Sequence, residues 1–309
     1  MAQTVAAGRD HRMAAARAGN VAAFAWRQSR RHQPWLCLLA VLIFPLTMVP
    51  LELQRRIIDR AIGNQNLDLL LWLGAIYLVV VLVQGGLKYL LRLYQGMVSE
   101  RTVLDLRRAV HAQDAGGGEG ETVSIVASEA ERIGGFVGEA FSEPLLQGGV
   151  LVAVLGYMLV IEPLIALISL AFFLPQILVV PIIQRFVNRW SRRKVELVRE
   201  LGDQIVEGAA DHRYAGTTDQ VYAVRMSYYR LKFLIKVFSN FMNHLAPLSV
   251  LMVGGYLVIN GQTTVGTVVA FISGFERMAD PSGQLLAYYR LAAETQVEYR
   301  LIAEQQLRA

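Results

Sequence analysis

Apolar runs that are almost free of charged residues alternate along this chain with helical stretches that are rich in charge. The apolar runs are long enough to cross the hydrocarbon core of a bilayer as helices. They predict six transmembrane helices, at about residues 34–61, 67–112, 126–161, 164–210, 219–259 and 265–305. No region is rich in strand signals, so the predicted fold class is all-α, a polytopic membrane protein with one domain over 34–309.

The connections between the predicted spans are very unequal in length. Charged helical stretches at Met97–Glu143 and Gln184–Lys236 each join two apolar runs, whereas the links Ile62–Leu67, Glu162–Pro163 and Asn260–Thr264 are short. Paired helices that leave the bilayer, run on into the cytosol and turn back there would produce this asymmetry. We therefore expect long cytoplasmic extensions, a shape that suits a permease bound from the cytosolic side by a partner protein.

The distribution of charge sets the expected orientation. The chain is 54% hydrophobic and 18% charged, with a net charge of +5, and most of its arginines precede the first span or lie in the two long connections. The positive-inside rule places these segments and both termini in the cytoplasm. Arg55, Arg56 and Arg60 break the rule, although Glu52 and Asp59 partly offset them. Because the basic residues flank spans, we expect the lipid bilayer as a partner and no nucleic acid.

The N-terminal segment differs from the rest of the chain. Residues 1–20 have no apolar periodicity and are predicted to be a disordered tail, without the apolar core of a signal peptide. Residues 21–33 mix aromatic side chains with arginines. This pattern predicts an amphipathic elbow helix on the cytoplasmic surface, with Trp26 and Trp35 as interface anchors.

Motifs for covalent chemistry, metals and nucleotides are missing from the sequence. The single cysteine, Cys37, allows no disulfide or thiolate zinc site within the chain. The glycine-rich segment Asp114–Gly120 lacks the Gly-Lys-Ser/Thr ending of a phosphate-binding loop and does not follow a strand, so it is interpreted as a flexible turn. No catalytic, cofactor-binding or metal-ligating residues are predicted in this chain.

Several local patterns, in their order and spacing, resemble the transmembrane half of a six-span ATP-binding cassette exporter over about Val21–Ala303. Pro50–Arg60 resembles the first outer corner of that family, and Gly120–Val126 resembles its first coupling helix. Ile205–Gly216 resembles the approach to the second coupling helix, and Thr264–Phe271 resembles span six.

The resemblance implies how such a chain would work. Two permease halves pair as a homo- or heterodimer, often with spans four and five exchanged, and coupling helices dock on a nucleotide-binding ATPase that uses ATP and Mg. Closure of the ATPases rocks the spans in alternating access, in a bacterial inner membrane. Family members usually continue into the ATPase after span six, whereas this sequence has no Gly-x-x-x-x-Gly-Lys-Ser/Thr motif. ATP hydrolysis is therefore expected in a separate subunit; loss or removal of the ATPase stays open.

Two groups of candidate site residues follow. Coupling to the ATPase is assigned to the two cytoplasmic turns, with Tyr214 as an aromatic anchor: Glu121, Thr122, Ser124, Ile125, Gly208, Asp211, His212, Arg213, Tyr214 and Gly216. Ionisable and polar groups within or beside spans are candidates for a cavity: Lys88, Arg92, Asn240, Asn243, His244, Glu276, Arg277 and Asp280. Lys88 and Arg92 could instead snorkel, and Arg277 could form an interfacial salt bridge.

Two other functions stay open. A proton-coupled transporter on the same fold would need a deep carboxylate relay, for which the candidates are Glu139, Glu143, Glu276 and Asp280, none convincingly deep by sequence. A non-transporting membrane anchor or assembly factor would have a closed, filled interior. Close helix packing is indicated by the glycines in the spans: Gly134, Gly135, Gly138, Gly148, Gly149, Gly156, Gly254 and Gly255.

Overall fold

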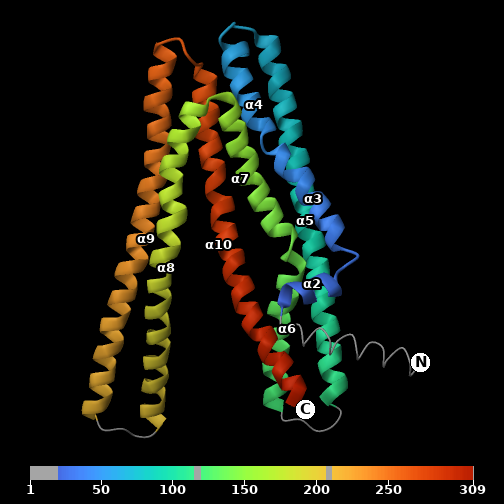
Figure 1. Cartoon of the computed structure of the whole chain (residues 1–309), viewed down its shortest axis with the longest axis vertical. Helices are drawn as coiled ribbons and strands as arrows, with labels where there is room; N and C mark the ends of the chain where they lie inside the picture. Colours follow the sequence, from blue (N-terminus) through green and yellow to red (C-terminus); the bar gives the residue numbers. More distant parts are fainter. Residues whose placement is uncertain (1–19, 115–119, 207–210, 309) are drawn as a thin grey trace. The chain divides into compact units, whose positions relative to one another are not determined.

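Figure 1 shows the computed structural model of the chain, which describes residues 20–114, 120–206 and 211–308. Side chains in these ranges are described except at 109–129, 169, 172, 173, 176, 177, 181, 211–213, 297, 298 and 300–308. Long helices make up almost all of the described chain, and no strand occurs in it. The prediction of an all-α membrane protein is confirmed.

The N-terminal part of the described chain forms four short helices. Helix α2 covers Val21–Gln28, and three further helices follow: α3 (Gln33–Leu46), α4 (Val49–Arg56) and the π-helical η1 (Ile57–Ile62). In a continuous helix the ring of Pro50 would clash with the carbonyl of the residue four positions earlier, Leu46, which is the last residue of α3. The helix is accordingly interrupted between α3 and α4.

Helices α5 and α6 pack closely against each other. Helix α5 is a single helix over Leu67–Asp114, and α6 (Gly120–Glu139) returns alongside it (Figure 1). The predicted third span is divided, because α6 ends at Glu139 and α7 begins at Ser142 (Ser142–Ile161). Tyr288 donates a hydrogen bond to the backbone carbonyl of Ala140, which lies in this break.

Helices α8 (Pro163–Val206) and α9 (Asp211–Ile259) form a long hairpin, coloured yellow-green to orange in Figure 1. Leu197, Val221 and Val224 form a buried apolar cluster between the two helices. Near the turn, Gln204 donates a hydrogen bond of 2.9 Å to Thr217. The gap predicted between the spans at 164–210 and 219–259 is too long on its C-terminal side, because α9 already begins at Asp211. Asp211 is an acidic residue at the N-terminus of α9, where negative charge is favoured. Gly216 lies inside the helix, and one glycine there costs only about 1 kcal/mol.

The chain folds into two compact units. The first unit contains the residues up to Tyr157 together with those from Arg277 onward, and the second unit is Met158–Glu276. Helix α10 (Val265–Arg308) contributes to both units.

Several helices could cross a membrane by length and composition. In the described part of the chain there are four such segments: Gln33–Ile62, Leu67–Arg108, Ser142–Ile161 and Tyr214–Ile259. The fourth predicted span lies in α8, where several side chains fall outside the described set. The sixth begins α10, whose apolar stretch is interrupted by Glu276, Arg277 and Asp280. The count of six spans therefore stays a prediction.

Helix α2 packs against protein on one side. Val21 and Ala25 are buried, and the Phe24 ring lies 5.2 Å from that of Tyr299, centroid to centroid. Trp26, by contrast, is 44% exposed. The elbow helix therefore exists over Val21–Gln28, and its contact with a membrane surface stays a prediction.

Candidate functional site

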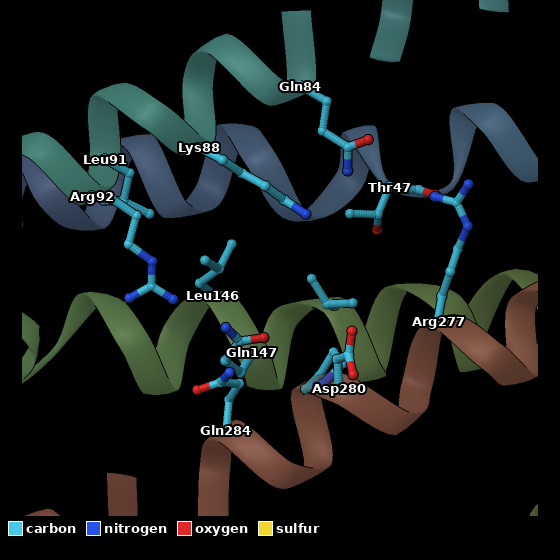
Figure 2. Close-up of a pocket in the computed structure, with 12 residues that line it drawn as sticks. Thr47, Gln84, Lys88, Leu91, Arg92, Leu146, Gln147, Arg277, Asp280 and Gln284 are labelled. Atoms are coloured by element: carbon cyan, nitrogen blue, oxygen red, sulfur yellow. The ribbon is translucent and has the colours of Figure 1, made fainter. Parts of the chain in front are cut away.

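A cavity of about 280 Å³ lies within the first unit, among α5, α7, α10 and the end of α3 (Figure 2). The wall contains cations, amides and apolar side chains in one small space. The lining residues are Thr47, Gln84, Lys88, Leu91, Arg92, Leu146, Gln147, Val150, Arg277, Asp280, Pro281 and Gln284.

Helical spacing brings these polar side chains to the cavity. Gln84, Lys88 and Arg92 recur every four residues, so they lie on one face of α5. Arg277 and Asp280 are three residues apart and share a face of α10 in the same way. In Figure 2, Lys88 extends from α5 into the space between the helices, and Arg277 extends from α10 toward Thr47.

Arg92 is held at the edge of the cavity by a buried carboxylate. Its guanidinium donates hydrogen bonds of 2.8 and 2.9 Å to the two carboxylate oxygens of Glu143, the second residue of α7. The Glu143 side chain is 3% exposed, and it also accepts hydrogen bonds from Gln95 and Gln147. The expectation that none of the candidate carboxylates is deep is wrong for Glu143.

Glu139 is the last residue of α6 and precedes the apolar segment Ser142–Ile161. It lies 3.6 Å from the Arg92 guanidinium.

Lys88 and Arg277 differ from Arg92 in their partners. Arg277 donates a long hydrogen bond of 3.5 Å to the backbone carbonyl of Thr47. No ion pair joins Lys88 or Arg277 to a carboxylate in the described part of the chain, although Asp280 lines the same cavity. The salt bridge considered for Arg277 is therefore not seen among these residues.

A second polar cluster is centred on Glu52 in α4. Glu52 pairs with Arg55 at 3.0 Å and Arg56 at 2.6 Å, and it accepts a hydrogen bond of 2.9 Å from the Tyr157 hydroxyl. The predicted compensation of these arginines by Glu52 is confirmed, and Tyr157 adds a link from α4 to α7.

Comparison with known families identifies the fold. The sequence model described as ABC transporter transmembrane region matches residues 35–208, more than half of the chain. The chain belongs to this family. Membrane regions of ABC transporters work as dimers with an ATPase, and the expected resemblance is confirmed at this level.

Curated relatives share limited identity with this ABC transporter membrane region. It is 21% identical over 252 residues to an ATP-dependent lipid A-core flippase of Syntrophus aciditrophicus (strain SB), a match covering 74% of this chain and 42% of the relative. It is 28% identical over 253 residues to a fatty acid ABC transporter ATP-binding/permease protein of Mycobacterium bovis (strain ATCC BAA-935 / AF2122/97), covering 75% of this chain and 39% of the relative. The chain thus spans about two fifths of the length of these relatives.

The described members of the predicted coupling set lie near the start of α6 or near the start of α9. Tyr214 is in the first turn of α9 and is 42% exposed, and Gly216 follows it in the same helix. Gly208 lies outside the described residues. Only the backbone is described for the remaining members, which lie in α6 or at the start of α9: Glu121, Thr122, Ser124, Ile125, Asp211, His212 and Arg213.

The structure brings together only part of the predicted cavity set. Lys88, Arg92, Arg277 and Asp280 line one cavity, whereas Glu276 is exposed and does not line it. The other predicted members lie on α9, in the second unit: Asn240, Asn243 and His244. No group of three or more potential metal ligands occurs in the described part of the chain.

Sequence reasoning missed the amides of the cavity wall, namely Gln84, Gln147 and Gln284. A signal for two of them was present. Gln84 precedes Lys88 by one helical turn, and Gln284 follows Asp280 by one turn, so each extends a polar stripe along its helix.

Proposed function

We propose that this chain is the permease subunit of an ABC exporter, which moves an amphipathic substrate by alternating access and is powered by a separate ATPase subunit. The membership of the ABC transporter transmembrane region family carries this proposal. ATP and Mg would bind in the ATPase, and a second permease half would complete the dimer. The direction of transport, export, is taken from the resemblance to the six-span exporter family.

The lengths of the helices support a role in mechanical coupling. Helices α5, α8 and α9 contain 48, 44 and 49 residues. At 1.5 Å per residue each is about 65–75 Å long, roughly twice the thickness of a bilayer core of about 30 Å. The excess length, placed in the cytosol by the positive-inside rule, would carry the C-terminal ends of α5 and α8 and the start of α9 to an ATPase.

The orientation follows from the same charges. Both termini would lie in the cytoplasm of a bacterial cell and the chain in the inner membrane, because basic residues precede the first span and flank the long connections. Since the 309 residues contain no Gly-x-x-x-x-Gly-Lys-Ser/Thr motif, nucleotide would be bound by residues outside them.

Co-purification from native membranes tests the proposal. We expect an ATPase polypeptide to purify with this chain in equal amount and to hydrolyse ATP faster in its presence. Reconstituted vesicles should transport only with ATP. Hydrolysis by the same polypeptide would contradict a separate subunit, and a preparation with neither ATPase nor transport would favour the anchor or assembly role.

The proton-coupled alternative makes the opposite prediction. Transport would persist without nucleotide and collapse when an uncoupler dissipates the proton gradient. Glu143 is the buried carboxylate that such a mechanism would use, but it is engaged by Arg92, Gln95 and Gln147. A carboxylate held in this way is better suited to joining two helices than to releasing a proton.

A further inference from the structure

The cavity of the first unit has an excess of positive charge that the chain itself leaves unneutralised. Three cations line it, Lys88, Arg92 and Arg277, against one carboxylate, Asp280. Glu143 neutralises Arg92 through two hydrogen bonds. Lys88 and Arg277 have no carboxylate within 4.0 Å in the described part of the chain, so both are available to an anion.

Uncompensated cations inside a membrane protein are expensive to place and therefore indicate a binding role. The surrounding groups suit an anion as well. The amides of Gln84, Gln147 and Gln284 add hydrogen-bond donors to the wall. Charge-assisted hydrogen bonds from Lys and Arg to carboxylate or phosphate are about twice as strong as neutral ones.

The size of the cavity indicates which part of a molecule it holds. Its volume of about 280 Å³ is below the usual range for a drug-sized ligand, so it fits a headgroup rather than a whole lipid. Its cations enter from different depths. Lys88 follows Leu67, the first residue of α5, by 21 residues, or about 32 Å of helix, whereas Arg277 follows Val265, the first residue of α10, by 12 residues, or about 18 Å.

We propose that this cavity binds the anionic headgroup of an amphipathic substrate, with Lys88 and Arg277 as its cationic ligands and Asp280 as a counter-charge that limits affinity. The proposal rests on the proposed transport function and adds the substrate class. The apolar part of the molecule stays outside the cavity, because Leu91, Leu146 and Val150 are the only large aliphatic side chains of its wall.

Binding to the purified full chain in phosphatidylcholine nanodiscs tests this site, with empty nanodiscs as background. The probe is radiolabelled dodecyl phosphate, compared with dodecanol and with inorganic phosphate. We expect Lys88→Gln and Arg277→Gln each to weaken dodecyl phosphate binding about tenfold, as the loss of a charged hydrogen-bond partner does. Asp280→Asn should tighten it several-fold, a change of opposite sign that loss of folding cannot mimic. Arg290→Gln, an exposed position on α10 outside the cavity wall, should leave it unchanged.

Three outcomes would overturn the site. Dodecanol could bind as tightly as dodecyl phosphate, the four variants could all behave alike, or inorganic phosphate could bind as tightly as the amphiphile. Because no ATPase is present in this measurement, its failure leaves the ATP-driven function intact. Conversely, charge-dependent binding without ATP-driven transport would overturn the proposed function and retain the site.

Discussion

Arg92 on α5 and Glu143 on α7 form a bidentate ion pair whose two side chains differ greatly in exposure. The Arg92 side chain is 47% exposed, whereas that of Glu143 is 3% exposed. The carboxylate is therefore the member that depends on the pair, because a buried charge without a partner is costly. Gln95 and Gln147 complete its hydrogen bonding, so α5 and α7 are joined through one anion.

Replacing Arg92 tests this dependence. Arg92→Ala should lower the free energy of unfolding by about 2–4 kcal/mol. This loss is smaller than for a fully buried ion pair, because the Arg92 guanidinium is half-exposed and partly screened by solvent. Thermal unfolding in detergent measures the change. Arg101→Ala, at an exposed position of the same helix, should change little.

A double variant separates the pair from its surroundings. Because Glu143→Gln removes the buried charge, the combination with Arg92→Ala should be less damaging than the sum of the two single changes. Strictly additive effects would show that the two side chains do not depend on each other.

Tyr157 offers a second test, on the cluster around Glu52. Tyr157→Phe removes one hydrogen bond to a charged acceptor and should cost about 1.5–3 kcal/mol. Glu52→Gln should cost more, because Arg55 and Arg56 lose their anion as well. Unfolding temperatures in detergent measure both, with Tyr256→Phe on α9 as an exposed control. Equal effects for the two tyrosines would contradict a link between α4 and α7.

Much of the fold could be predicted because hydrophobic length and charge are local properties of the sequence. The predicted span at 67–112 matches α5 at Leu67–Asp114, and 265–305 matches α10 at Val265–Arg308. The break between α6 and α7 was missed, although the sequence contains its signal: Pro144 has no N–H to donate to the carbonyl of Ala140, four residues earlier. The partner of that carbonyl, Tyr288, is distant in sequence and had no such signal.

The candidate site was predictable only in part, because contacts between residues distant in sequence leave no local pattern. Single charges in an apolar run mark Lys88, Arg92 and Arg277 as unusual within the sequence. The pairing of Arg92 with Glu143 spans 51 positions, and no periodicity connects them. Sequence reasoning therefore found the cations of the cavity but not which of them is already neutralised.

Two glycines of α6 give a matched pair for testing helix packing. A Cβ added to Gly138 would lie 2.5 Å from the backbone oxygen of Gln95, whereas one added to Gly135 meets nothing within 4 Å. Gly138→Ala should therefore push α6 from α5 and cost about 1–3 kcal/mol. Gly135→Ala should be neutral or stabilise by up to about 1 kcal/mol. Denaturant unfolding of the two variants measures the difference, and equal stabilities would contradict the close approach of α5 and α6.

The second cytoplasmic turn gives the most direct test of coupling to an ATPase. Tyr214 is exposed in the first turn of α9, and exposed aromatic side chains are frequent anchors of protein interfaces. Tyr214→Ala and Asp211→Lys should each weaken ATPase docking about tenfold or more, a hot-spot effect of about 2 kcal/mol.

Tyr222→Ala is the matched control, because Tyr222 is also exposed but lies two helical turns farther along α9. It should leave docking unchanged. Pull-down of the ATPase and ATP-driven transport are measured together, and the unfolding temperature shows that the helices remain intact. If docking and transport survive both changes, then the start of α9 is not the surface that receives the ATPase, and the start of α6, with Glu121 and Thr122, becomes the position to test.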